Sequence, residues 1–147
     1  MAWRPVAFSS MERTLVICKP DAVERRLVGE IISRFERKAL RIAAVEVRVL
    51  DAALLAEHYE EHIEKSFYAD LVAFMSRGPS IVMVVEGPEE TCSIVRNLIG
   101  ATNPFEAAPG TIRGDYGLAV TENLVHGSDS TQSAQREIGI FFSRTLI

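Results

Sequence analysis

The sequence has few cysteines, no long apolar run and no excess of positive charge. Its 147 residues include only 2 cysteines, Cys18 and Cys92, which is too few for a disulfide framework or a cysteine-built zinc site. No apolar segment approaches the ~18 residues of a membrane-spanning helix, so we expect no membrane association. The 16 basic and 20 acidic side chains give a net charge of -4, which argues against nucleic acid as the main ligand. A local basic pocket is still compatible with this balance.

Both cysteines fall in apolar patterns, Cys18 in a strand-like run and Cys92 in a helical one. We expect each to be a buried or half-buried free thiol, as is usual in a reducing compartment. Residues 1–10 lack the apolar stretch of roughly 7–15 residues that marks a secretory signal. The sequence therefore predicts a cytoplasmic protein in which 1–10 form an N-terminal appendage and 11–147 form one folded domain.

The apolar pattern predicts alternating strands and helices. Strands are expected at 14–18, 41–50, 80–86 and 115–120, and helices at 28–40, 52–59, 67–75, 88–99 and 130–138. In the second strand Val45, Val47 and Val49 share one parity, which predicts one buried face. The segment 101–114 is rich in Pro, Gly, Thr and Asn. A loop this long in a compact domain is usually functional or disordered.

This order of elements is similar to the split βαβ arrangement of ferredoxin-like domains (βαββαβ). We therefore expect an α+β fold, with helices on one face of a four-stranded antiparallel sheet. A parallel, doubly wound sheet is the weaker alternative, because it expects glycines at the first strand-to-helix turn. This chain has Lys19 and Pro20 there, and Pro20 suits the first turn of a helix.

The 3 histidines differ in their surroundings. His58 and His62 lie four residues apart, as a metal-binding pair on a helix would, but the glutamates around them indicate a solvated helix face. His126 lies among small polar residues just before an expected helix start, where anions are favoured. Imidazole can be neutral and nucleophilic near neutral pH. Taken alone, His126 is either a loop histidine or a nucleophile.

Three cations stand in unusual local contexts. Lys19 follows the first strand, Arg96 precedes the long loop, and Arg113 lies between two glycines, where the backbone can approach a ligand closely. Arginine forks match phosphate oxygens. The sequence contains neither a Walker-type phosphate loop nor a kinase glycine loop. Any nucleotide would therefore be bound by scattered cations.

Four segments, in combination, point to a family. They are RTLVICKPDAV at 13–23, GATNP at 100–104, PGTIRGD at 109–115 and NLVHGSDS at 123–130. In order and separation these segments resemble nucleoside diphosphate kinases, and the resemblance extends over 12–142. It implies the ferredoxin-like fold already expected from the order of the elements.

The resemblance implies an enzyme that moves the terminal phosphate of a nucleoside triphosphate onto a nucleoside diphosphate through a phosphohistidine. His126 falls on the family's nucleophile and Glu137 on the carboxylate that orients it. The matched phosphate- and ribose-binding positions are Lys19, Arg96, Thr102, Arg113 and Asn123. The matched base-contacting positions are Phe67 and Val120, and the supporting positions are Tyr59 and Ser128.

The resemblance also implies a cofactor and partners. Mg2+ would bridge the substrate's own phosphates and need few protein ligands, with Asp129 as a candidate to hold it through water. Lys19, together with the two arginines, could neutralise charge on the transferring phosphate. The implied partners are nucleoside di- and triphosphates and further copies of the chain, in a tetramer or hexamer with 101–114 at or beside the contacts. The implied role is to maintain nucleoside triphosphate pools.

Two other function classes are alternatives to this enzyme. A catalytically silent nucleotide-binding or scaffold protein of the same fold would be favoured by loss of His126, Lys19 or Asn123, and all three are present. A nucleic-acid-binding regulator would need a basic stripe, which the sequence lacks.

Overall fold

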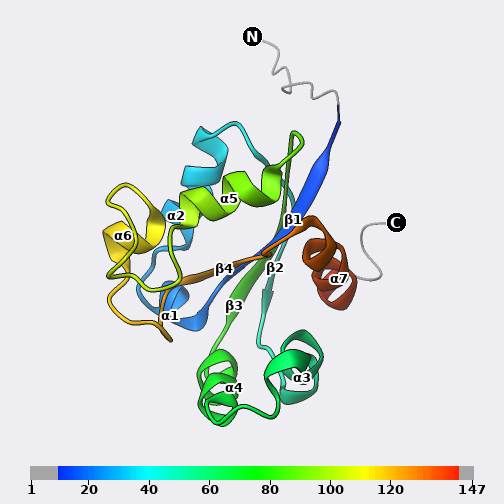
Figure 1. Cartoon of the computed structure of the whole chain (residues 1–147), viewed down its shortest axis with the longest axis vertical. Helices are drawn as coiled ribbons and strands as arrows, with labels where there is room; N and C mark the ends of the chain where they lie inside the picture. Colours follow the sequence, from blue (N-terminus) through cyan, green and yellow to red (C-terminus); the bar gives the residue numbers. More distant parts are fainter. Residues whose placement is uncertain (1–9, 143–147) are drawn as a thin grey trace.

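The computed structural model describes residues 10–142, which form a four-stranded antiparallel sheet with helices (Figure 1). The strands are β1 (Glu12–Cys18), β2 (Arg41–Arg48), β3 (Ser80–Gly87) and β4 (Val125–Gly127). Their order in the sheet is β2-β3-β1-β4, and each neighbouring pair is antiparallel. This is the α+β, split βαβ arrangement that the sequence predicts. The nearly continuous apolar runs of β1 and β3 explain why these two strands are central.

The helices connect the strands in the predicted order. They are α1 (Pro20–Glu24), α2 (Val28–Arg37), α3 (Ala52–His58), the 3-10 turn η1 (Glu60–His62), α4 (Tyr68–Ser76), α5 (Thr91–Ile99), α6 (Ile112–Tyr116) and α7 (Thr131–Phe142). Pro20 occupies the first turn of α1, as expected. Asp51 caps α3 by accepting a hydrogen bond from the Leu54 amide at 2.8 Å.

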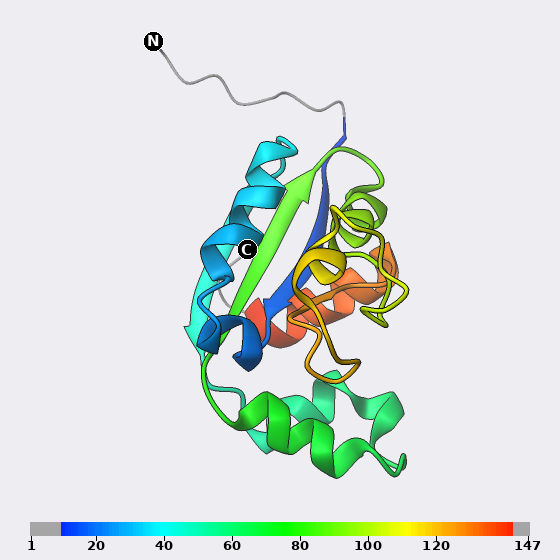
Figure 2. The same ribbon diagram turned by 90° about the vertical axis from the view of Figure 1, so that its left-hand side faces the viewer.

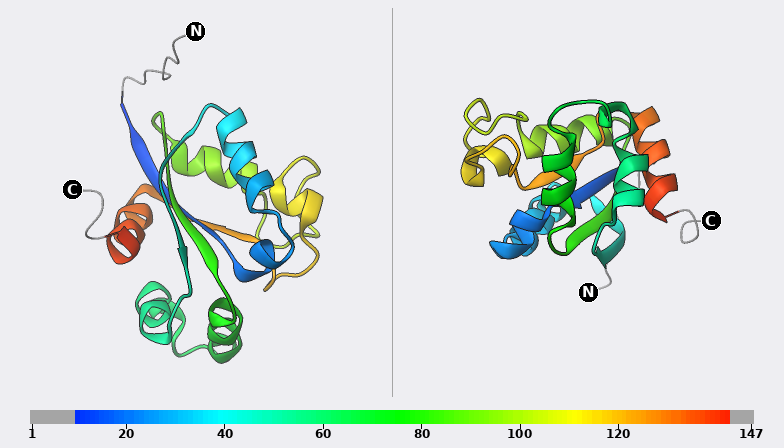
Figure 3. Two further views of the ribbon diagram at one scale, coloured as in Figure 1. Left: turned by 180° about the vertical axis from the view of Figure 1, so that it is seen from behind. Right: turned by 90° about the horizontal axis from the view of Figure 1, so that it is seen from below.

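Helices cover both faces of the sheet, so the expectation of a single covered face was wrong. Val16 and Cys18 of β1 pack against α2 and α5, whereas Leu15 and Ile17 pack beneath α7 and the α3–α4 pair. Figure 3 shows α7 on the opposite side of the sheet from α2 and α5. Because β1 is apolar at both parities, each face needs cover. The α3–α4 pair lies at one end of the sheet (Figure 2).

The predicted strand at 115–120 is also wrong. The chain forms α6 there and then runs without regular structure, and the fourth strand is β4. Thr111 caps α6 by accepting a hydrogen bond from the Gly114 amide at 3.0 Å. Leu118 and Val120 are 76% and 53% exposed, so the apolar alternation in this segment does not reflect burial.

Strand β2 has one face that is more buried than the other, but it is the half-buried face with Ile42, Ala44 and Glu46, and the valine face is exposed. Val45, Val47 and Val49 are 53%, 72% and 68% exposed. Strand β2 lies at the edge of the sheet, and the helices of the same chain do not cover this part of it. The valine face in the single chain is therefore an apolar surface beside an unpaired strand edge.

Both cysteines are buried free thiols, as predicted. Burial raises the pKa of Cys18 to about 12, with a smaller contribution from Asp21, so this thiol stays protonated. Across the described residues, no helix combines the length and apolar character needed to cross a membrane. The predicted appendage at 1–10 lies outside the described residues except for Ser10.

Candidate active site

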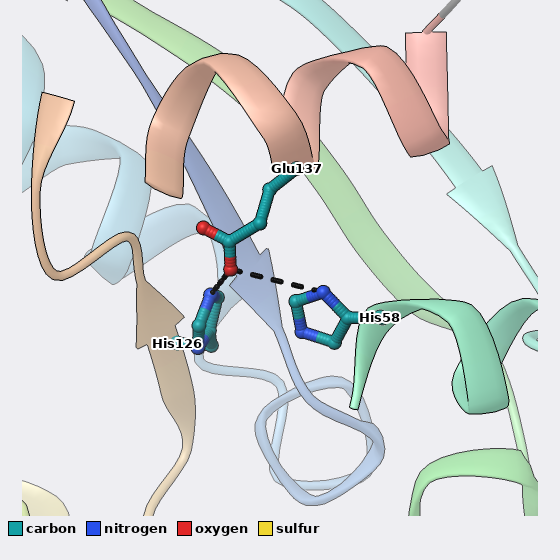
Figure 4. Close-up of side chains that lie close together, drawn as sticks. All are labelled: His58, His126 and Glu137. Carbon is teal, nitrogen blue, oxygen red and sulfur yellow. Dashed lines mark hydrogen bonds and ion pairs between the residues drawn. The ribbon is translucent and has the colours of Figure 1, made fainter. Parts of the chain in front are cut away.

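His126 lies on β4, not in the loop suggested by its small polar neighbours. His126 pairs with Ile17 of the central strand β1, and this pairing fixes the backbone on either side of His126. Its Nε2 atom is 2.6 Å from Oε1 of Glu137, which comes from α7 (Figure 4). The structure thus brings together the predicted nucleophile and the carboxylate predicted to orient it, although they are 11 residues apart in sequence.

The Glu137 carboxylate determines which nitrogen of His126 is free. Burial acts to raise the pKa of Glu137, but the hydrogen bond and charge of His126 outweigh burial and hold the pKa below its ordinary value. An ionised carboxylate can only accept, so Nε2 of His126 is the donor. In the neutral ring Nδ1 then carries the lone pair. A histidine that attacks through Nδ1 must be in this tautomer, with its proton on Nε2.

Lys19 follows β1, is buried and lines the site. Its ammonium donates to Oδ1 of Asn123 at 2.8 Å, and its amide donates to the Leu124 carbonyl at 2.8 Å. Burial lowers the pKa of Lys19 to about 8, with a further contribution from Arg113 and an opposing one from Asp21. Lys19 is therefore charged at neutral pH, but its charge is poorly solvated, as suits a group that binds an anion.

Two arginines add positive charge beside Lys19. The Arg113 guanidinium donates to the carbonyls of Asn123, Gly100 and Val125 at 3.2, 3.1 and 2.5 Å. Burial and the nearby Arg96 lower the pKa of Arg113 to about 10, which leaves it charged. Arg96 is exposed and donates to the Gly127 carbonyl at 3.1 Å. Both arginines are therefore held against the backbone of the segment that carries His126.

These groups line one cleft with a volume of about 380 Å³. Of the residues predicted for the site, those in the cleft lining are Lys19, Tyr59, Phe67, Arg96, Thr102, Arg113, Asn123, His126, Asp129 and Glu137. Asn123 donates from Nδ2 to the Thr102 carbonyl at 3.0 Å, which links the long loop to the site. The lining thus combines cationic groups with one apolar ring, that of Phe67, which is 48% exposed.

Two predicted residues are not in the cleft lining. Ser128 is buried, and its hydroxyl accepts from the Leu15 amide at 3.2 Å, so it ties the end of β4 to β1. Val120 is 53% exposed outside the lining, so the structure does not bring it together with Phe67.

Tyr59 lines the cleft, and burial raises the pKa of its hydroxyl well above the ordinary range, so the phenol remains neutral.

His58 lines the cleft, although its sequence context did not indicate a functional residue. The glutamates around it predicted a solvated helix face, yet the His58 side chain is only 2% exposed and faces Glu137 (Figure 4). The available signal was Leu55, three residues earlier, because residues at that spacing share one face of a helix. Leu55 is fully buried, and His58 lies on the same buried side of α3.

His58, His126 and Glu137 form a group that could hold a metal ion, and among the described residues His62 is not part of this group. The ligand atoms of the three residues lie within 4.8 Å of one another, and zinc accepts two histidines with a carboxylate. The surroundings oppose a cation, because Lys19 and the two arginines line the same cleft. A metal ion would also have to displace the 2.6 Å hydrogen bond. The cleft therefore suits an anion better.

An α+β domain whose cleft sets cations beside a histidine–carboxylate pair has the features of a phosphotransferase. Residues 12–147 match the nucleoside diphosphate kinase family. The nucleoside diphosphate kinase of Thermobifida fusca is 59% identical over 132 residues, covering 90% of this chain and 97% of the relative. That of Archaeoglobus fulgidus is 56% identical over 133 residues, covering 90% and 87%.

A solved structure gives the same result. The halophilic nucleoside diphosphate kinase of Halobacterium salinarum, in complex with CDP, superposes with a TM-score of 0.87 at 46% identity, covering 90% of this chain and 88% of that one. The chain therefore belongs to the nucleoside diphosphate kinase family, and it is an enzyme of nucleotide phosphotransfer.

Proposed function

We propose that the enzyme transfers the γ-phosphate of a nucleoside triphosphate to a nucleoside diphosphate in two half-reactions, with the phosphate held on His126 Nδ1 between them. The observation that carries this proposal is the 2.6 Å hydrogen bond between His126 Nε2 and Glu137 Oε1. That bond leaves Nδ1 with the lone pair in a cleft that also contains Lys19, Arg96 and Arg113.

The atoms of this transfer balance without a separate acid or base. In the first half-reaction the Nδ1 lone pair attacks the γ-phosphorus, and the bond from that phosphorus to the β–γ bridging oxygen breaks. The diphosphate leaves with the electron pair, while the Nε2 proton stays in its hydrogen bond with Glu137. A second diphosphate then attacks the phosphohistidine through its terminal oxygen and restores the free imidazole.

The cations of the cleft balance the charge that this transfer develops. Lys19 and Arg113 are buried and charged, so their interaction with phosphate oxygens is stronger than that of exposed side chains. Mg2+, brought in with the nucleotide, would neutralise the oxygens of its phosphates. Asp129 fits a water-mediated contact, because it lines the cleft and hydrogen bonds from Ser133 and Ser130 lower its pKa. A lowered pKa keeps this carboxylate ionised.

Among the described residues, the site has an aromatic platform for the base but no free side-chain amide to read the edge of the base. Phe67 offers a half-exposed ring, and stacking accepts every base. Asn123 is the one side-chain amide in the cleft lining, and Lys19 and Thr102 already occupy it. We therefore expect purine and pyrimidine diphosphates to be used with efficiencies within ~1–2 kcal/mol of each other. The complex of the Halobacterium salinarum relative with CDP agrees with use of a pyrimidine.

The experiment that tests this function is a two-substrate initial-rate study. ATP is varied at several fixed concentrations of a second diphosphate, such as dTDP, and ADP formation is measured. A ping-pong route gives parallel lines in double-reciprocal plots, whereas direct transfer in a ternary complex gives intersecting lines. A catalytically silent scaffold of the same fold would bind nucleotide without forming ADP, which would contradict the proposal.

A further inference from the structure

His58 is a buried polar side chain that no hydrogen bond explains. Within the described residues, neither of its ring nitrogens has a hydrogen-bond partner. Burial and, next, the nearby His126 lower the pKa of His58 to about 3, so the ring is neutral. A buried polar group without a partner destabilises the fold, and an apolar side chain would avoid that cost. Its presence beside the reacting histidine therefore needs a reason.

The geometry directs His58 at the active-site carboxylate. Its Nδ1 atom lies 3.7 Å from Oε1 of Glu137, the same oxygen that accepts from His126 (Figure 4). The rings of His58 and His126 meet edge to face, with centroids 5.0 Å apart and planes at 86°. A closure of less than about 1 Å would bring Nδ1 within hydrogen-bond distance of the carboxylate oxygen.

The placement of His58 relative to Glu137 is itself fixed. Arg136, the residue before Glu137 on α7, donates to the carbonyl of Glu57 at 2.5 Å and to that of His58 at 3.4 Å. A guanidinium at the last carbonyls of a helix is also favoured by the helix dipole. This contact docks the C-terminal end of α3 onto α7. Because His58 lies on α3 and Glu137 lies on α7, the docking of the two helices fixes the position of the His58 side chain relative to the Glu137 side chain.

We propose that His58 is a positioning residue for the histidine–carboxylate pair. In its neutral form with the proton on Nδ1, His58 is a second donor directed at Oε1 of Glu137. It keeps that carboxylate ionised and turned toward His126, so that His126 retains its proton on Nε2 and its lone pair on Nδ1. This role rests on the proposed function of His126 and deepens it.

The direct test is nitrogen-15 NMR of histidine-labelled protein without nucleotide. Long-range nitrogen–proton correlations identify which ring nitrogen carries the proton, and His62→Gln and His126→Gln proteins assign the signals. In the native protein we expect the proton on Nδ1 of His58 and on Nε2 of His126. In His58→Leu we expect a mixture of both His126 tautomers. This readout does not depend on turnover, so it separates failure of the inference from failure of the proposed function.

Kinetics of matched variants complete the test. In His58→Leu the rate of phosphorylation by saturating ATP should fall about tenfold, with the nucleotide KM changed by less than roughly twofold. His58→Asn places an amide donor near the Nδ1 position and should restore most of the rate. Phe141→Leu is the packing control, because its ring also contacts that of His58, with centroids 5.3 Å apart, and it lies outside the cleft lining.

Three results would overturn the proposal. One is an unchanged His126 tautomer in His58→Leu. The second is a His58→Asn protein as slow as His58→Leu, because a donor would then be irrelevant. The third is an equal loss of rate in Phe141→Leu, which would reduce the role of His58 to packing.

Discussion

Lys19 is the residue whose charge is most sensitive to its surroundings. It is only 8% exposed, and its ammonium contacts Asn123 while Arg113 lies nearby. Burial is the main cause that disfavours the charged form and Arg113 adds to it, and together they outweigh Asp21 and account for a pKa of about 8 where an ordinary lysine has 10.5. An anionic phosphate would reverse this balance, so binding of the substrate and protonation of Lys19 support each other.

A pH profile tests this coupling. As pH rises through about 8, the free enzyme loses the Lys19 cation, and kcat/KM for the nucleotide should fall on the alkaline side. Bound nucleotide stabilises the cation, so kcat itself should stay level to a higher pH. In Lys19→Arg the alkaline fall in kcat/KM should disappear, whatever the absolute rate. A native kcat/KM that remains flat to pH ~9.5 would contradict this account of Lys19.

The lowered pKa of Lys19 also predicts how the free energy of unfolding changes with pH. Between pH of about 8 and 10.5 the unfolded chain binds the Lys19 proton and the folded chain does not. The contribution of this group to the free energy of unfolding therefore rises with pH in that window. Comparison of native and Lys19→Met proteins by urea unfolding at both ends of the window isolates the contribution.

At the scale of elements, the predictable parts are those with strong local patterns. The apolar runs of β1 and β3 and the Asp51 cap of α3 can be read from neighbouring residues. Strand β4 cannot, because its three residues are ordered by pairing with β1 and by the hydrogen bond from the Lys19 amide to Leu124. The predicted strand at 115–120 failed for the opposite reason, since its Leu118 and Val120 face outward.

The residues of the candidate site likewise differ in how far the sequence predicts them. Most of its residues were identified by resemblance to a family, because cations scattered over separate segments have no local signature. His58 was missed because its neighbours Glu57 and Glu60 are exposed while its own side chain turns inward. Sequence spacing gives the face of a helix, but only the docking of α3 on α7 decides what that face meets.

Helix α6 gives a prediction at this scale. A Cβ atom at Gly114 would lie 1.9 Å from the Ala108 carbonyl oxygen, so the loop or α6 must shift in Gly114→Ala. The neighbouring Arg113 would move with α6, and we expect kcat/KM to fall about ten- to hundredfold. The matched control is Gly139→Ala on the exposed side of α7, where a Cβ meets nothing within 4 Å. This control should keep its activity and gain up to ~1 kcal/mol of stability. Equal activity of the two variants would contradict the prediction.

For the whole molecule, the exposed valine face of β2 supports the predicted homo-oligomer. The unpaired edge strand β2 carries the exposed Val45 and Val47, and the exposed Val49 follows it directly. A second copy could cover this surface by the same face, as twofold symmetry requires. The loop 101–114 is the other predicted contact, and its Phe105 is 81% exposed. The cytoplasmic location, like the choice between tetramer and hexamer, stays a prediction.

Light scattering of two charged variants tests the assembly. Val47→Glu should reduce the native oligomer to smaller species, because a buried carboxylate in the β2 contact would be unpaired. Phe105→Glu should do so only if the long loop also forms a contact. Native protein that scatters as a single 16.3 kDa chain at micromolar concentration would show that the prediction of an oligomer is wrong.

The central claim is that His126 carries the phosphate, and the most direct measurement is the phosphoenzyme itself. Native protein incubated with labelled ATP and Mg2+, without acceptor, should gain one phosphate per chain. The label should be labile in acid and stable in alkali, as expected for a phosphoramidate, and any nucleoside diphosphate should discharge it. His126→Ala should take up no label. Acid-stable label on the native protein, or full label on His126→Ala, would contradict the account, because Ser128 and Ser130 are the nearest alternative acceptors in the sequence.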